Sequence, residues 1–82
     1  MTSREQREIL GRNIRSIRKE AGLTQSALAE PLHCTPAYIS MIESGKAGIT
    51  VDMLVEVAEL LGVAPRMLLD QDCPHRKVSM AS

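Results

Sequence analysis

Aromatic side chains are almost absent from this chain. Its 82 residues include one tyrosine and neither tryptophan nor phenylalanine. Hydrophobic residues still make up 44% of the sequence, which is enough for a packed core and too many for a disordered chain. The core must therefore be aliphatic. A chain of this length has room for one domain with a thin core, which excludes a large enzyme with its own substrate domain.

Cysteines and long apolar runs are also scarce. Cys34 and Cys73 are the only cysteines, whereas a small secreted domain usually needs two or more disulfide bridges. No apolar run approaches the roughly 20 residues that a transmembrane helix needs, and no signal peptide opens the sequence. We therefore expect a cytoplasmic protein with reduced thiols and no membrane partner.

The residues of an enzyme or a metal centre are missing as well. Neither His33 nor His75 has a carboxylate or nucleophile at a spacing that would assemble a catalytic group. Together with Cys34 and Cys73, these histidines fit no common zinc-ligand pattern. We predict no enzyme, no catalytic residues, no metal site and no cofactor, and no small-molecule ligand is evident.

Charge is balanced overall but unevenly distributed. Residues 1–46 carry seven Lys or Arg against five Glu, whereas residues 47–82 carry three basic residues against five acidic ones. A basic half suggests a surface that faces an anionic partner, and an acidic half suggests a separate surface with another task. Ordinary solvated charge is the alternative interpretation of this pattern.

Apolar spacing and capping residues predict an all-α protein of about five short helices. The expected helices span residues 3–21, 25–30, 36–44, 51–61 and 65–69. Threonines at 24, 35 and 50 are suitable N-caps, and glycines at 22, 45 and 62 are suitable stops. Pro31 should keep the second helix short or bent. We expect one domain over residues 1–70 and a polar, flexible tail over residues 71–82.

An ordered set of short motifs runs through most of the chain. They are Gly22-Leu23-Thr24-Gln25, Leu28-Ala29-Glu30, Tyr38-Ile39-Ser40, Ile42-Glu43-Ser44-Gly45-Lys46, Leu54 with Ala58, and Leu61-Gly62-Val63. Over residues 9–69 this set resembles the Xre-type, lambda-repressor-like helix-turn-helix domains of phage repressors and small bacterial regulators. The resemblance implies a compact five-helix DNA-binding domain. Its second and third helices would form the helix-turn-helix, with the third helix in the major groove of a palindromic operator bound by a homodimer.

The resemblance assigns base reading to the exposed edge of the third helix. The candidates there are Thr35, Pro36, Ala37, Ser40 and Met41. None of them is the Arg or Lys that reads guanine or the Asn or Gln that reads adenine. We therefore expect modest direct readout, with specificity from DNA shape, water bridges and half-site spacing. A face that binds protein instead is the alternative.

The resemblance also assigns contacts with the DNA backbone. The candidates are Arg12, Thr24, Gln25, Tyr38, Ser44, Lys46 and Gly48. Gln25 begins the second helix, where free N–H groups suit an anion. Lys46 offers a point charge, and Gly48 lets the chain approach closely. A solvated helix start, a packed Tyr38 ring and a generic loop are the corresponding structural interpretations.

Other positions that match the family are expected to be structural. Arg18 and Glu43 match a pair that forms a salt bridge between the first and third helices, and an Arg fork fits a carboxylate well. His33 replaces the glycine that is usual in the turn, and histidine tolerates a left-handed backbone better than most residues. Cys34 occupies a position where a small apolar side chain packs.

The fourth expected helix has more apolar surface than one core-facing stripe needs. On a helical wheel its three carboxylates cluster within about 60°, and apolar residues fill roughly 220° of the rest. A two-fold homodimer would cover the excess, although a helix central to the monomer core is the alternative. The interface candidates are Met53, Val55, Leu60, Met67 and Leu68.

These observations predict a sequence-specific, double-stranded-DNA-binding transcriptional regulator that acts as a repressor or an autoregulatory controller. Two alternatives use the same fold differently. One is an antitoxin-type regulator that also binds a toxin protein, and the other is a protein-interaction module without a DNA role. The uncharged edge of the third helix favours the second alternative, whereas steeply salt-dependent DNA binding would exclude it.

Overall fold

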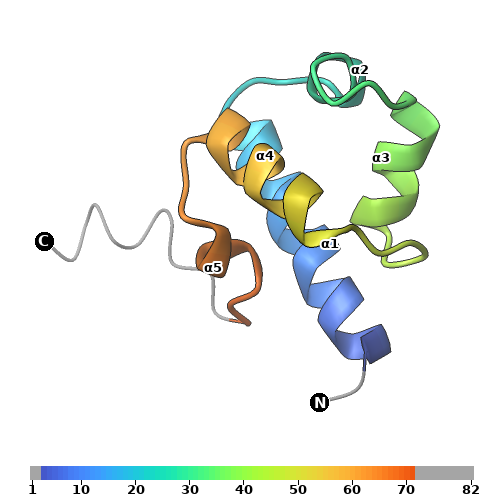
Figure 1. Cartoon of the computed structure of the whole chain (residues 1–82), viewed down its shortest axis with the longest axis vertical. Coiled ribbons are helices and arrows are strands. Elements are labelled where there is room, and N and C mark those ends of the chain that lie inside the picture. Colours follow the sequence, from blue (N-terminus) through green and yellow to red (C-terminus); the bar gives the residue numbers. More distant parts are fainter. Residues whose placement is uncertain (1–2, 72–82) are drawn as a thin grey trace, which may run out of the picture.

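The computed structural model describes residues 3–71, which form five α-helices and no strand (Figure 1). The helices are α1 (Ser3–Glu20), α2 (Gln25–Ala29), α3 (Pro36–Glu43), α4 (Val51–Leu61) and α5 (Pro65–Leu68). The prediction of an all-α, five-helix fold is confirmed. The remainder of the expected tail, with Cys73 and His75, lies outside the described residues. No helix among residues 3–71 combines the length and apolarity needed to cross a membrane.

Local capping explains where the helices begin and end. The hydroxyls of Thr24, Thr35 and Thr50 each accept a hydrogen bond of 3.0–3.1 Å from the backbone N–H three residues later. Gly62 ends α4 in the left-handed conformation, with φ 74°. α2 stops at Ala29, two residues before Pro31, as expected from the missing N–H of proline.

The turn between α2 and α3 contains the only non-glycine residue with positive φ among residues 3–71. This residue is His33, with φ 57°. The next residue, Cys34, packs part of its side chain on the core, and burial raises the pKa of its thiol. The thiol therefore stays protonated at neutral pH. Within residues 3–71, no group of three or more His, Cys, Asp or Glu side chains is placed to hold a metal ion.

The core is aliphatic and draws on all five helices. Its buried members are Leu10, Ile14, Ile17, Leu28, Ala29, Ile39, Ile42, Val57, Ala58, Leu61 and Leu68. The prediction that Leu68 belongs to an exposed dimer surface is wrong. Its side chain is fully buried within the protomer, because α5 packs that side chain beneath α1 and α4.

Side chains of α1 hold the end of α5 in place. The buried Asn13 amide donates hydrogen bonds to the carbonyl oxygens of Leu68 at 2.9 Å and Asp70 at 2.8 Å. Gln6 donates another to the carbonyl of Leu69 at 3.3 Å. Because the last carbonyls of a helix have no partner within it, these contacts replace the missing backbone hydrogen bonds.

A close approach of main chains sets the distance between α1 and α3. Gly11 is buried in α1, and a Cβ atom added there would overlap the carbonyl oxygens of Ile42 and Glu43. Backbone atoms cannot rotate away as a side chain can. Gly11 is therefore required by this contact, and no feature of the local sequence indicated its role.

We predict that Gly11→Ala lowers the free energy of unfolding by about 1–3 kcal/mol, because the added methyl group forces α1 and α3 apart. Urea denaturation followed by circular dichroism measures the change. Gly48→Ala is the matched control, since a Cβ there would meet only the flexible side chain of Arg7 at 3.4 Å. Equal stability of the two variants would contradict the prediction.

Candidate nucleic-acid interface

Arg18 and Glu43 form a bidentate ion pair between α1 and α3. Arg18 Nε lies 2.6 Å from Glu43 Oε2, and Nη2 lies 3.1 Å from Oε1. The side chains are only 7% and 3% exposed. Arg18 Nη1 also donates to the carbonyl oxygen of Leu23 at 2.6 Å, just before α2. One guanidinium group therefore links α1, the start of α2 and the end of α3.

Gln25 joins the same network. Its Nε2 donates a hydrogen bond of 3.1 Å to Glu43 Oε1. A primary amide carries two N–H donors, so this bond uses one of them and leaves the other for an external acceptor. Glu43 therefore orients the Gln25 amide at the first turn of α2, next to the N-cap Thr24.

The candidate base-reading residues share the exposed surface of α3 and its N-cap. Thr35, Pro36, Ala37, Ser40 and Met41 are all exposed. The Thr35 hydroxyl accepts a hydrogen bond from the Tyr38 N–H, which ties it to helix capping. Ile39 and Ile42 on the opposite side of α3 are buried in the core. The packing thus presents one small, uncharged face to the exterior.

The loop from Ser44 to Thr50 is tied back onto α3. Tyr38 donates its hydroxyl hydrogen to the carbonyl oxygen of Gly48 at 2.9 Å. The backbone N–H of Lys46 donates to the carbonyl of Met41 at 2.9 Å, and the Ser44 hydroxyl donates to the same carbonyl at 3.1 Å. Tyr38 therefore positions the loop, while the Lys46 side chain remains exposed.

Arg12 lies apart from the other candidates for phosphate contacts. Its Nη2 donates to the carbonyl oxygen of Gln71 at 3.4 Å, beyond the end of α5. Figure 1 shows α5 and α3 on opposite sides of α1. The structure therefore does not bring Arg12 together with Gln25 or Lys46.

The exposed members among the remaining candidates for a dimer surface lie on two sides of α4. Val55 and Leu60 are both exposed, but five residues of helix separate them by about 140° around the axis. The three carboxylates of α4, at Asp52, Glu56 and Glu59, lie between them. Met53 and Met67 are half-buried.

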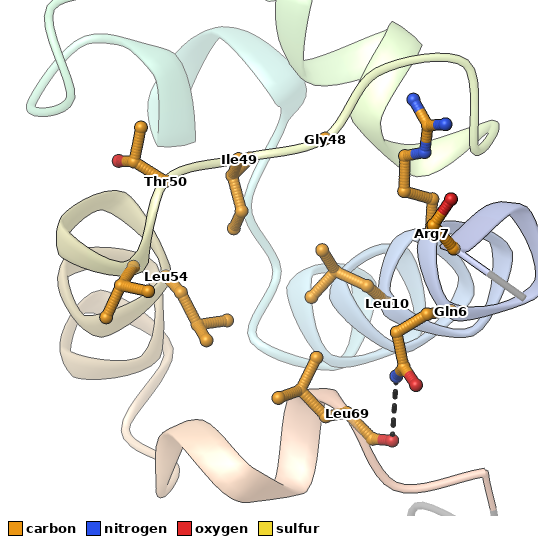
Figure 2. Close-up of a pocket in the computed structure, with 10 residues that line it drawn as sticks. Gln6, Arg7, Leu10, Gly48, Ile49, Thr50, Leu54 and Leu69 are labelled. Atoms are coloured by element: carbon orange, nitrogen blue, oxygen red, sulfur yellow. Dashed lines mark hydrogen bonds between the residues drawn. The ribbon is translucent and has the colours of Figure 1, made fainter. Parts of the chain in front are cut away.

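Two exposed apolar residues that were not among the interface candidates lie on the Val55 side of α4. Val51 is 74% exposed at the start of α4, and Leu69 is 41% exposed after α5. Both line an open pocket of about 630 Å³, together with Leu10, Ile49 and Leu54 (Figure 2). We refer to Val51, Val55 and Leu69 as the Val51 patch. The docking of α5 on α1 is what brings Leu69 to the same pocket as Val51 and Leu54.

The arrangement of α2 and α3 defines the class of protein. A short helix, a tight turn and a second helix with one exposed face form a helix-turn-helix. The helix-turn-helix family profile matches residues 14–68. This chain belongs to the Xre-type, lambda-repressor-like helix-turn-helix family of transcriptional regulators.

Three similar proteins illustrate the family. The transcriptional regulator RamB of Mycobacterium tuberculosis is 35% identical over 63 residues, which cover 77% of this chain and 13% of RamB. Control protein C.BamHI of Bacillus amyloliquefaciens is 34% identical over 65 residues, covering 78% of this chain and 80% of that protein. The crystal structure of the clp gene regulator ClgR from Corynebacterium glutamicum matches with a TM-score of 0.76 at 31% identity. The match covers 92% of this chain and 80% of the ClgR chain.

The chain therefore spans about an eighth of RamB but most of the other two proteins. The shared family and fold are those of transcription regulators and not of enzymes.

We predict that Glu43→Gln lowers the free energy of unfolding by about 3–5 kcal/mol, because it leaves the Arg18 charge buried without a counterion. Chemical denaturation measures this loss, with Glu56→Gln on the exposed side of α4 as the control. The double variant Arg18→Met/Glu43→Leu should recover most of the stability, since it removes both buried charges. A Glu43→Gln protein as stable as the control would refute this account.

Proposed function

We propose that this chain is a sequence-specific DNA-binding regulator that inserts α3 into the major groove. The observation that carries the proposal is the buried Arg18–Glu43–Gln25 network. It links α1, α2 and α3 and uses one of the two amide donors of Gln25, which leaves the other for an external acceptor. An amide at the first turn of a helix is well placed to bind a backbone phosphate.

A second group of proposed phosphate contacts lies at the loop after α3. Lys46 supplies an exposed positive charge there, and Ser44 and Gly48 belong to the same tethered loop. Because Tyr38 donates its hydroxyl hydrogen to the carbonyl oxygen of Gly48, its proposed role in DNA binding is indirect. It holds this loop in position. Arg12 can join these contacts only by leaving the carbonyl of Gln71.

The exposed face of α3 supports only limited base reading. Ala37 and the Thr35 methyl group can contact thymine methyls, and the Ser40 hydroxyl can bond a base edge. No charged side chain reaches out from this face. We therefore propose that DNA shape and the spacing of two half-sites supply much of the specificity.

Two half-sites require two protomers, and the Val51 patch is the surface that we propose for the homodimer. It is apolar and borders the pocket that Leu54 and Leu69 line (Figure 2). On the opposite side of α4, Leu60 lines a pocket with Glu56 and Glu59, whereas no carboxylate among residues 3–71 lines the pocket at Val51. The Val51 patch therefore favours a two-fold contact, and the operator would be palindromic.

The proposed regulatory role is that of a repressor or an autoregulatory controller. The similarity to control protein C.BamHI, most of whose length the chain covers, supports a role as a controller. The described residues include no second domain.

We predict that the purified protein binds its own upstream DNA more tightly than a scrambled duplex, with two protomers per site. Fluorescence anisotropy over a salt series measures both affinities. Lys46→Gln should weaken both complexes and lower the salt slope by about 0.9 for each protomer bound, because one phosphate contact is lost. Arg66→Gln, on α5, should leave the slope unchanged.

Two outcomes would contradict this proposal. Equal affinity for the upstream and scrambled duplexes would show that binding is not sequence-specific. No binding to either duplex at low salt would favour the antitoxin-type or protein-interaction alternatives, in which the α3 face contacts protein.

We also predict that Val55→Glu weakens self-association at least tenfold, because a two-fold axis would bring the new charges close together. Sedimentation equilibrium measures the dissociation constant. Leu60→Glu is the matched control, since it introduces the same charge at an equally exposed site on the other side of α4. A stronger effect from Leu60→Glu would place the interface on that side.

A further inference from the structure

Arg7 is the α1 cation that lies beside the α3–α4 loop. A Cβ atom on Gly48 would stand 3.4 Å from Arg7 Cδ and 3.8 Å from Cγ, so the stem of Arg7 runs along the loop backbone. In Figure 2 the Arg7 side chain rises from α1 toward this loop and points away from Leu10 and Leu69.

The guanidinium group of Arg7 has no carboxylate partner within residues 3–71. Glu8 is the nearest acidic residue along α1, and it pairs with Arg4 at 3.5 Å. The loop adds the exposed charge of Lys46. The surface formed by Arg7 and the loop therefore has two cations without partners, which favours an anion.

Gly48 is where the loop meets Arg7. Its carbonyl accepts the hydrogen bond from Tyr38, and a Cβ on it would be at ordinary contact distance from the Arg7 stem, so the loop backbone and that stem lie side by side. α1 also packs against the other end of the loop, where Glu8 lies against Gly45. Arg7 is thus held against the segment proposed to follow the DNA backbone, whereas Arg12 points toward the end of α5.

We propose that Arg7 is an additional phosphate-binding residue that extends the DNA contact from the α3–α4 loop onto α1. The proposal rests on the DNA-binding function proposed above. A guanidinium group can donate two parallel hydrogen bonds to one phosphate, so the contact adds orientation as well as charge. A phosphate contact does not distinguish one base from another. The Arg7 contact would extend the stretch of DNA backbone that the protein touches beyond the helix-turn-helix.

The test compares Arg7→Gln with Arg66→Gln in the salt-series anisotropy experiment, with Lys46→Gln as a positive control. Arg7→Gln should weaken binding to the upstream and scrambled duplexes by the same factor, roughly threefold to tenfold. Its salt slope should fall by about 0.9 for each protomer, and Arg7→Lys should retain the slope. Arg7→Met keeps the aliphatic stem against Gly48, so the same loss in that variant excludes a packing effect.

The outcomes separate this proposal from the proposed function. If Lys46→Gln lowers the slope but both neutral Arg7 variants behave like Arg66→Gln, DNA binding stands and the Arg7 contact is overturned. If the unaltered protein binds neither duplex, both proposals are overturned. A loss that is larger on the upstream duplex than on the scrambled one would also overturn a phosphate contact, because it would indicate base reading.

Discussion

The ion pair between Arg18 and Glu43 is the constraint on which the rest of the structure depends. Two opposite charges are buried beneath three helices, and each is satisfied only while those helices keep their places. Hydrophobic contacts of the aliphatic core tolerate small shifts, whereas a bidentate pair requires a defined geometry. Gly11 allows this geometry, because α1 and α3 can meet main chain to main chain near the pair. The orientation of the helix-turn-helix follows from these contacts.

The same network connects stability to the proposed function. Glu43 accepts from Gln25 as well as from Arg18, so the residue that neutralises the buried charge also orients a proposed phosphate donor. Tyr38 has a comparable double role, since its position on α3 determines where the next loop runs. Glu43 and Tyr38 thus each position another group, the Gln25 amide in one case and the α3–α4 loop in the other. The contacts that we propose with DNA are therefore mostly with its backbone, in keeping with the uncharged face of α3.

The surface of α4 shows how packing separates residues that a helical wheel groups together. The wheel predicts excess apolar area, but it does not show which part of that area the monomer already covers. Docking of α5 buries Leu68 and leaves Leu69 exposed beside Val51. The acidic side of α4 then separates Val55 from Leu60. A single candidate interface in the sequence becomes two surfaces in the structure, and only one of them borders an apolar pocket.

The sequence by itself determined the number of helices and where several of them begin and end. Threonine caps, glycine stops and Pro31 act within a few residues, so the ends of α4 and the shortness of α2 could be predicted from local chemistry. The motif order also identified the family and the Arg18–Glu43 pair. Only the tertiary structure decided which side chains meet across helices. It directed Arg12 to the end of α5, placed Arg7 against the α3–α4 loop and made Gly11 indispensable. These outcomes depend on contacts between residues distant in sequence, and such contacts leave no periodic or capping signal in the chain.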